Sequence, residues 1–112
     1  MKKVYPVIFT QMDDCILVDI PDLEVLTQGQ NLANAIEMAR DAIGVKGISL
    51  EDSKLSIPEP SKKVDISKGA FIKNGDSFIS LVDVDFEIYR RELDNKMVRR
   101  NVTLIMKRSI ED

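Results

Sequence analysis

Alternate carboxylates around residue 85 are the first side chains whose spacing could support chemistry. Asp83, Asp85 and Glu87 occupy every second position of one segment, so they would share one face of a β-strand. Carboxylates placed in this way can hold a magnesium ion in nuclease-type sites if other elements supply further acidic groups. The N-terminal aspartates that could do so are Asp13, Asp14, Asp19 and Asp22. A metal-dependent nuclease remnant therefore stands as one hypothesis, beside an ordinary acidic strand face exposed to water.

The usual catalytic groups are absent from the sequence. The chain has no histidine, which is the commonest general base and metal ligand. Its five glycines do not have the spacing of a phosphate-binding loop. The single cysteine, Cys15, adjoins an apolar segment without a basic partner, so we expect an inert thiol. We predict that the protein is not an enzyme and needs no cofactor and no metal ion.

Basic residues are concentrated near the C-terminus. Residues 88–108 carry seven basic and two acidic side chains, whereas residues 1–61 carry 5 basic and 10 acidic ones. Arg99, Asn101 and Thr103 alternate along a segment of strand-like composition, and such side chains on a β-ribbon can read base edges in a major groove. With Arg100 they are candidate nucleic-acid contacts; a polar outer face of an edge strand is the alternative. An acidic body and a basic tail suggest two different partners.

The length of 112 residues suits one domain with a single core and leaves room for a short appendage. No apolar run approaches the roughly 20 residues that span a bilayer, and the first residues lack the apolar core of a signal peptide. We therefore expect a cytoplasmic protein that makes no membrane contact.

Apolar periodicity predicts strands, one helix and two hairpins. Residues 4–9 and 15–20 should pair around a turn at 11–14, and Pro6 should lie at an edge or a bulge. Asn31 is the expected N-cap of a helix with an alanine-rich stripe that ends at Gly44. Asn74-Gly75 predicts a second hairpin between residues 70–73 and 76–79.

The strand after this turn should run to Phe86. Because Ile79 and Leu81 make its first half apolar on both faces, we expect another element to cover that end. Residues 86–93 could form two helical turns that 94–96 interrupt, and 97–106 resemble one further strand. This last strand offers Val98, Val102 and Leu104 for burial and cannot be stable alone, so we predict a homodimer or higher oligomer in which it pairs with another subunit.

Several short motifs, taken in order, resemble the HicB antitoxin family. They are a Tyr-Pro-Val strand at 5–9, an acidic turn, Pro-Asp-Leu at 21–23, Thr-Gln-Gly at 27–29, the alanine-rich helix and Ile-Pro-Glu-Pro-Ser at 57–61. The chain departs from the family pattern after Leu23, where a proline and a glycine are missing, and at Ala33 and Asn34, which replace an acidic pair.

The resemblance implies an α+β fold in which a small antiparallel sheet packs on one helix, as in a partial, degenerate ribonuclease-H-like domain. It assigns residues 1–88 to a HicB-like domain, and 89–112 to a basic linker and ribbon-like strand. It also implies a prokaryotic toxin–antitoxin system in which the chain neutralises a HicA-like, mRNA-cleaving toxin. The excess of acidic side chains in residues 1–61 adds the hypothesis that this acidic body imitates phosphate charge. The candidate toxin contacts are Asp13, Asp14, Asp19 and Asp22.

Residues 99–104 resemble the strand that opens a ribbon-helix-helix DNA-binding domain, but the eight residues from Ile105 are too few for its two helices. Without those two helices, the strand would not be held in the position that operator recognition requires. We therefore expect the basic segment to bind duplex DNA weakly and without sequence preference. A nucleic-acid-binding regulator that acts through this tail is the alternative to an antitoxin.

Overall fold

The computed structural model describes residues 1–97, and the side chains of residues 1–95. The predicted dimerisation residues Val98, Val102 and Leu104 lie outside the described residues. So do the candidate nucleic-acid contacts, which are Arg99, Arg100, Asn101 and Thr103.

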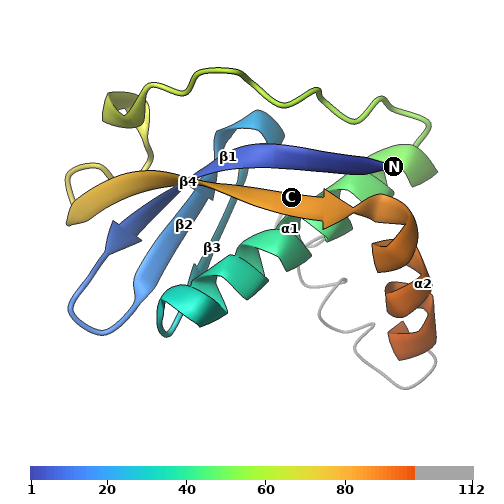
Figure 1. Ribbon diagram of the computed structural model, residues 1–112, viewed down its shortest axis with the longest axis horizontal. Helices are drawn as coiled ribbons and strands as arrows, with labels where there is room; N and C mark the ends of the chain where they lie inside the picture. Colours follow the sequence, from blue (N-terminus) through green and yellow to red (C-terminus); the bar gives the residue numbers. More distant parts are fainter. Residues whose placement is uncertain (98–112) are drawn as a thin grey trace.

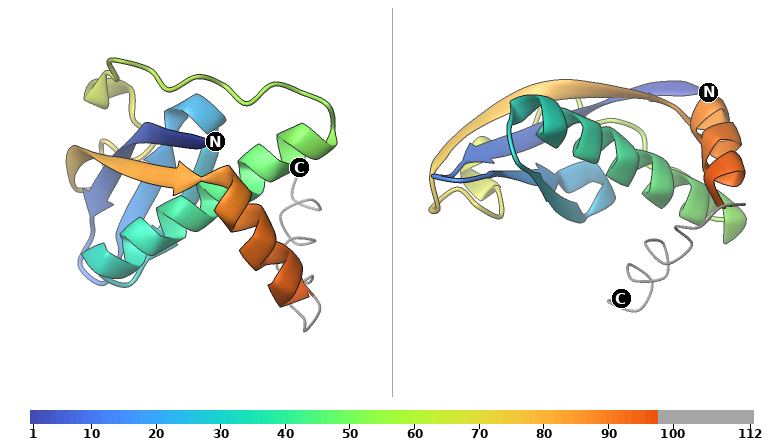
Figure 2. Two further views of the ribbon diagram at one scale, coloured as in Figure 1. Left: turned by 45° about the vertical axis from the view of Figure 1, so that its right-hand side comes forward. Right: turned by 90° about the horizontal axis from the view of Figure 1, so that it is seen from below.

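The protein is an α+β structure built on a four-stranded antiparallel sheet (Figure 1). The strands are β1 (Lys2–Gln11), β2 (Ile16–Ile20), β3 (Val25–Gly29) and β4 (Asp76–Asp85), in the spatial order β3-β2-β1-β4. Helix α1 (Leu32–Asp52) crosses one face of the sheet, and α2 (Phe86–Met97) follows β4 directly and packs on α1 (Figure 2). The predicted fold class is confirmed, with one helix packed on the sheet. The helical turns expected over 86–93 are found as α2, but the interruption expected at 94–96 was wrong, because α2 continues to Met97.

The first hairpin is confirmed. Phe9 lies opposite Val18 and Gln11 opposite Ile16, and a 3-10 turn at Pro21–Leu23 follows β2. Strand β1 pairs with β2 only from Ile8 onward. Pro6 therefore lies where β1 has a strand on one side only, which agrees with the expectation that it occupies an edge-like position.

The second hairpin was predicted wrongly. Residues 70–74 form turns, and β4 instead pairs with β1 along its whole length, from Lys2 opposite Asp85 to Gln11 opposite Asp76. Asn74 and Gly75 lie between these turns and β4, but neither has the positive φ that an Asn-Gly hairpin turn requires. The turn does not determine which strand β4 pairs with. Strand β4 pairs with β1 because the long apolar β1 buries far more surface than the segment at 70–73 could.

Helix α1 begins as predicted but does not end at Gly44. The Asn31 side chain accepts a hydrogen bond from the Asn34 amide at 2.8 Å, which confirms the N-cap. Gly44 and Gly47 lie inside the helix, where a Cβ on Gly44 would come within 2.6 Å of the Tyr89 ring. These glycines are thus close-approach positions for α2, and the helix continues for two further turns.

The core lies between α1 and the sheet. It combines alternate residues of the strands with the small residues of α1: Tyr5, Val7, Phe9, Val18, Ile20, Val82, Val84, Ala35, Ala39, Ala42 and Ile43. On β4, burial is confined to the half that ends at Phe86. Ile79 and Leu81 are exposed among the described residues, so the element expected to cover them is not found there.

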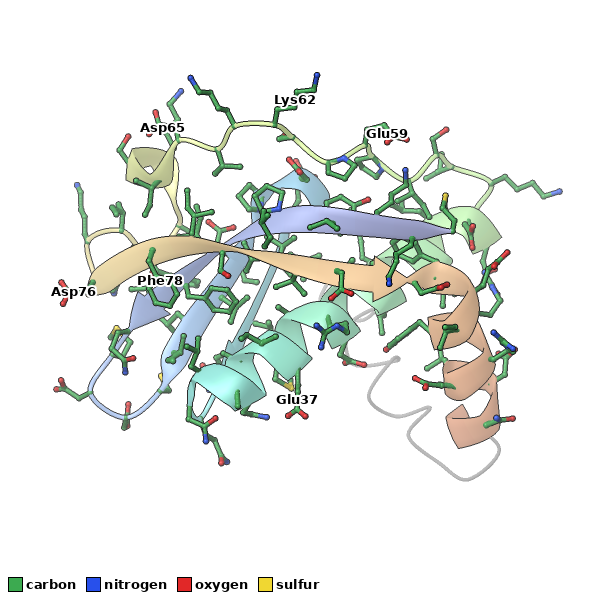
Figure 3. All side chains as sticks on the ribbon, in the orientation of Figure 1. Glu37, Glu59, Lys62, Asp65, Asp76 and Phe78 are labelled. Carbon is green, nitrogen blue, oxygen red and sulfur yellow. The ribbon has the colours of Figure 1, made fainter. Side chains whose placement is uncertain are left out.

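Residues 53–75, here called the connecting segment, run from the end of α1 to the start of β4 (Figure 3). Its first half is tied to β1: the Tyr5 hydroxyl donates to the Pro58 carbonyl at 2.6 Å, and Lys3 pairs with Glu59 at 2.8 Å. Burial of Tyr5, with the charges of Glu59 and Asp22 nearby, raises the pKa of the phenol to about 12.

Tyr5→Phe tests this tie. At neutral pH the variant should lose about 0.5–1.5 kcal/mol of unfolding free energy in urea denaturation, because one buried hydrogen bond is removed. A phenol whose pKa is raised on folding stabilises the native state below the unfolded pKa of about 10, and this contribution is lost as the pH rises toward 12. Wild type should therefore lose stability between pH 10 and 12 more steeply than Tyr5→Phe. Equal slopes would contradict the assignment.

Candidate functional site

One end of the sheet carries three exposed carboxylates. Asp13 and Asp14 form the turn between β1 and β2, and Asp76 begins β4 directly beside them, across a shallow hollow at the Asn74-Gly75 turn. Asp76 is labelled at this end in Figure 3. None of the ion pairs found among the described residues involves these three side chains, here called the acidic end. Their charge is therefore available to a partner.

Asp76 was missed by sequence reasoning because it joins the acidic end only through β-pairing. Its register partner is Gln11, the last residue of β1, immediately before the acidic turn. No local motif signals this neighbourhood. The expectation that Asp13 and Asp14 lie at an exposed turn agrees with the structure.

The other two aspartates assigned to toxin contact hold the connecting segment in place. Asp19 is only 8% exposed and accepts a hydrogen bond from the Ala70 amide at 2.8 Å. Asp22 accepts from the amide and the hydroxyl of Ser61, at 2.7 and 2.5 Å. The structure thus does not bring the four aspartates together. A lone aspartate inside an apolar strand is itself a signal of such a role, since a buried carboxylate needs a hydrogen-bond donor.

The alternate carboxylates at residue 85 are occupied by contacts within the fold. Arg40 donates to the Asp83 carboxylate at 3.0 Å and to its backbone carbonyl at 2.9 Å, and this lowers the pKa of Asp83. Asp85 accepts from the amides of Glu87 and Ile88 at 3.1 and 3.2 Å, in the manner of an N-cap for α2.

Glu87 lies in the first turn of α2, so the expectation that it shares a strand face with Asp83 and Asp85 was wrong. Within the described residues, no group of three or more histidine, cysteine, aspartate or glutamate side chains is arranged to hold a metal ion. The hollow between β4 and the two helices is lined by side chains of both charge signs. Lys2 and Arg40 are basic, and Asp83 and Glu92 are acidic.

The remaining titratable side chain of interest is Cys15, at the start of β2. Burial and the neighbouring Asp14 raise the pKa of its thiol, which favours the protonated, unreactive form at neutral pH. Within the part of the chain that the structure describes, no helix is both long and apolar enough to cross a bilayer.

Comparison with solved structures finds chains of the same fold. One belongs to a structure described as a toxin–antitoxin complex from Streptococcus pneumoniae, with 22% identity, a TM-score of 0.61 and coverage of 100% of this chain and 99% of that chain. Another belongs to a HicA3 and HicB3 toxin–antitoxin complex, with 20% identity, a TM-score of 0.59 and coverage of 73% and 98%. No protein-family model matches the sequence, and no curated protein matches it. At these identities the likeness establishes a shared fold.

Proposed function

We propose that this chain is the antitoxin of a toxin–antitoxin pair, a binding module that neutralises a small HicA-type mRNA-cleaving toxin by covering its RNA-binding surface. The observation that carries the proposal is the fold, since it covers nearly all of a chain taken from a toxin–antitoxin complex. The ordered HicB-like motifs of residues 5–61 support the choice of antitoxin over toxin. A nuclease role is disfavoured because the candidate metal ligands already have partners: Asp83 pairs with Arg40, and Asp85 accepts hydrogen bonds from the first amides of α2.

Charge supports the same partner. Residues 1–97 carry 12 basic and 17 acidic side chains. A protein that cleaves RNA must present a basic surface to hold the phosphates, and an acidic protein is electrostatically complementary to that surface. The acidic end offers three exposed carboxylates that form no ion pair within residues 1–97, so it is the surface to which we assign the toxin contact.

Neutralising the acidic end should slow association with the toxin. The variant Asp13→Asn, Asp14→Asn, Asp76→Asn removes three charges, and we expect its association rate with a HicA-type toxin encoded beside this chain to fall about tenfold at low salt. The difference should shrink as salt screens the charges. Stopped-flow mixing measures the rate, and rescue of growth on co-expression measures neutralisation.

The matched control removes three other exposed carboxylates, through Glu24→Gln, Glu37→Gln and Glu92→Gln. It has the same net charge as the test variant and should associate severalfold faster. Equal rates would remove the acidic end from the proposal, and wild-type protein that neither binds nor neutralises the toxin would overturn the proposal itself. RNA hydrolysis by the purified chain with a divalent metal, abolished by Asp83→Asn, would favour the nuclease alternative.

The proposal extends to the basic segment, which lies mostly outside the described residues. Its net charge of +5 over residues 88–108 would attract duplex phosphates weakly and without sequence preference, and autoregulation would require the complex to add a preference for operator DNA. Helix α2 carries the first residues of this segment and follows the end of β4 opposite to Asp76.

A further inference from the structure

Strand β4 forms an open edge of the sheet. It pairs with β1 along one side, and no strand within residues 1–97 pairs with its other side. Phe78 and Ile79 are each 39% exposed and Leu81 is 68% exposed, so the first half of this edge is apolar (Figure 3). A long apolar edge with free backbone groups is a template for another strand.

The backbone groups that face this edge can be identified from the register. Pro6 lies opposite Leu81 and has no N–H, so this pair is of the non-hydrogen-bonded type. The N–H and C=O groups of Leu81, and by alternation those of Ile79 and Asp83, therefore point away from β1. The Arg40 guanidinium, which reaches the Asp83 carbonyl at 2.9 Å, agrees with this direction. Among residues 1–97, Arg40 of α1 thus occupies this edge at Asp83, and no strand pairs with it at Ile79 and Leu81.

We infer that this open edge pairs with the same edge of a second copy of the chain, antiparallel about a two-fold axis at Ser80. In this register Ile79 of each copy lies opposite Leu81 of the other, and the free N–H and C=O groups of both residues meet. Phe78, which stacks on Phe9 with ring centroids 5.5 Å apart, lies opposite Val82. The two four-stranded sheets become one continuous sheet.

Charge selects both the partner and the register. With Ser80 on the axis, Asp76 lies opposite Val84 and Asp83 opposite Ser77, so no two carboxylates face each other. An axis at Val82 would instead set Asp83 against Leu81 and Asp85 against Ile79. An apolar centre between polar ends is complementary to itself, which favours a second copy over an unrelated strand. This interface shares only Asp76 with the acidic end, and it is distinct from the predicted pairing of residues 97–106.

Disulfide formation across the axis tests the inference on the full chain. Cys15→Ser removes the one native thiol, and Ser80→Cys then places two thiols on the axis. Opposed Cα atoms in a non-hydrogen-bonded pair are about 4.5 Å apart, within the range that a disulfide spans. We expect mild oxidation at micromolar concentration to give a covalent dimer at least about tenfold faster than a control cysteine gives one, because the thiols are held together.

The control is Asp76→Cys in the same Cys15→Ser background. This exposed position lies eight residues along the strand from its symmetry mate, or about 27 Å, so it reports collisional cross-linking only. Adding Leu81→Lys to the Ser80→Cys chain should reduce its rate to that of the control, while circular dichroism remains native because Leu81 is exposed. Equal rates for Ser80→Cys and Asp76→Cys, or a Ser80→Cys rate that Leu81→Lys leaves unchanged, would overturn the inference.

Discussion

Phe86→Ala is expected to lower the unfolding free energy of the full chain by about 3–5 kcal/mol, the range for a large aromatic side chain removed from a packed core. Phe86 is 2% exposed and lies against Gly47 of α1 at the junction between β4 and α2. Its amide donates to the Met1 carbonyl at 2.9 Å, which joins this junction to the start of β1. Urea denaturation followed by circular dichroism measures the loss.

Ile88→Ala provides the comparison within the same helix. Ile88 is 46% exposed, so its truncation should cost less than about 1 kcal/mol. If the two variants were equally stable, Phe86 would not be the residue that anchors α2.

Local signals in the sequence were sufficient for the elements that depend on near neighbours. The acidic turn and the Asn31 cap were both predicted correctly from residues within a few positions of one another. The same reasoning failed at Gly44, because the sequence cannot show that Tyr89, far along the chain, packs against it. It failed at the second hairpin because strand pairing is decided by the apolar surface that β1 offers and not by the turn.

The residues of the candidate site also separate into those that local sequence predicts and those that depend on the fold. Exposure of Asp13 and Asp14 follows from a turn that local residues specify, whereas the addition of Asp76 needs the pairing of β1 with β4. Asp19 and Asp22 look like surface acids from composition alone, yet both bind amides of the connecting segment. Electrostatic patterns along a sequence therefore indicate the sign of a surface, while the fold decides which charges remain available to a partner.

Gly47→Ala should destabilise the protein by about 1–3 kcal/mol, the cost of overpacking a well-filled contact. A Cβ at residue 47 would lie 2.8 Å from Cδ1 of Phe86 and closer still to Cε1. Helix propensity alone predicts the opposite sign, because alanine is favoured over glycine inside a helix by about 1 kcal/mol. The sign of the change therefore reports whether the ring contact or the helix preference dominates.

A double-mutant cycle with Phe86→Leu isolates that contact. Leucine lacks the outer ring atoms that approach residue 47, so Gly47→Ala should cost much less in the Phe86→Leu background, with a coupling of about 1 kcal/mol or more. Ser49→Ala, at an exposed position of α1, should change stability by no more than about 0.5 kcal/mol in either background. A Gly47→Ala effect that is identical in both backgrounds would mean that the glycine serves the helix itself and not its approach to α2.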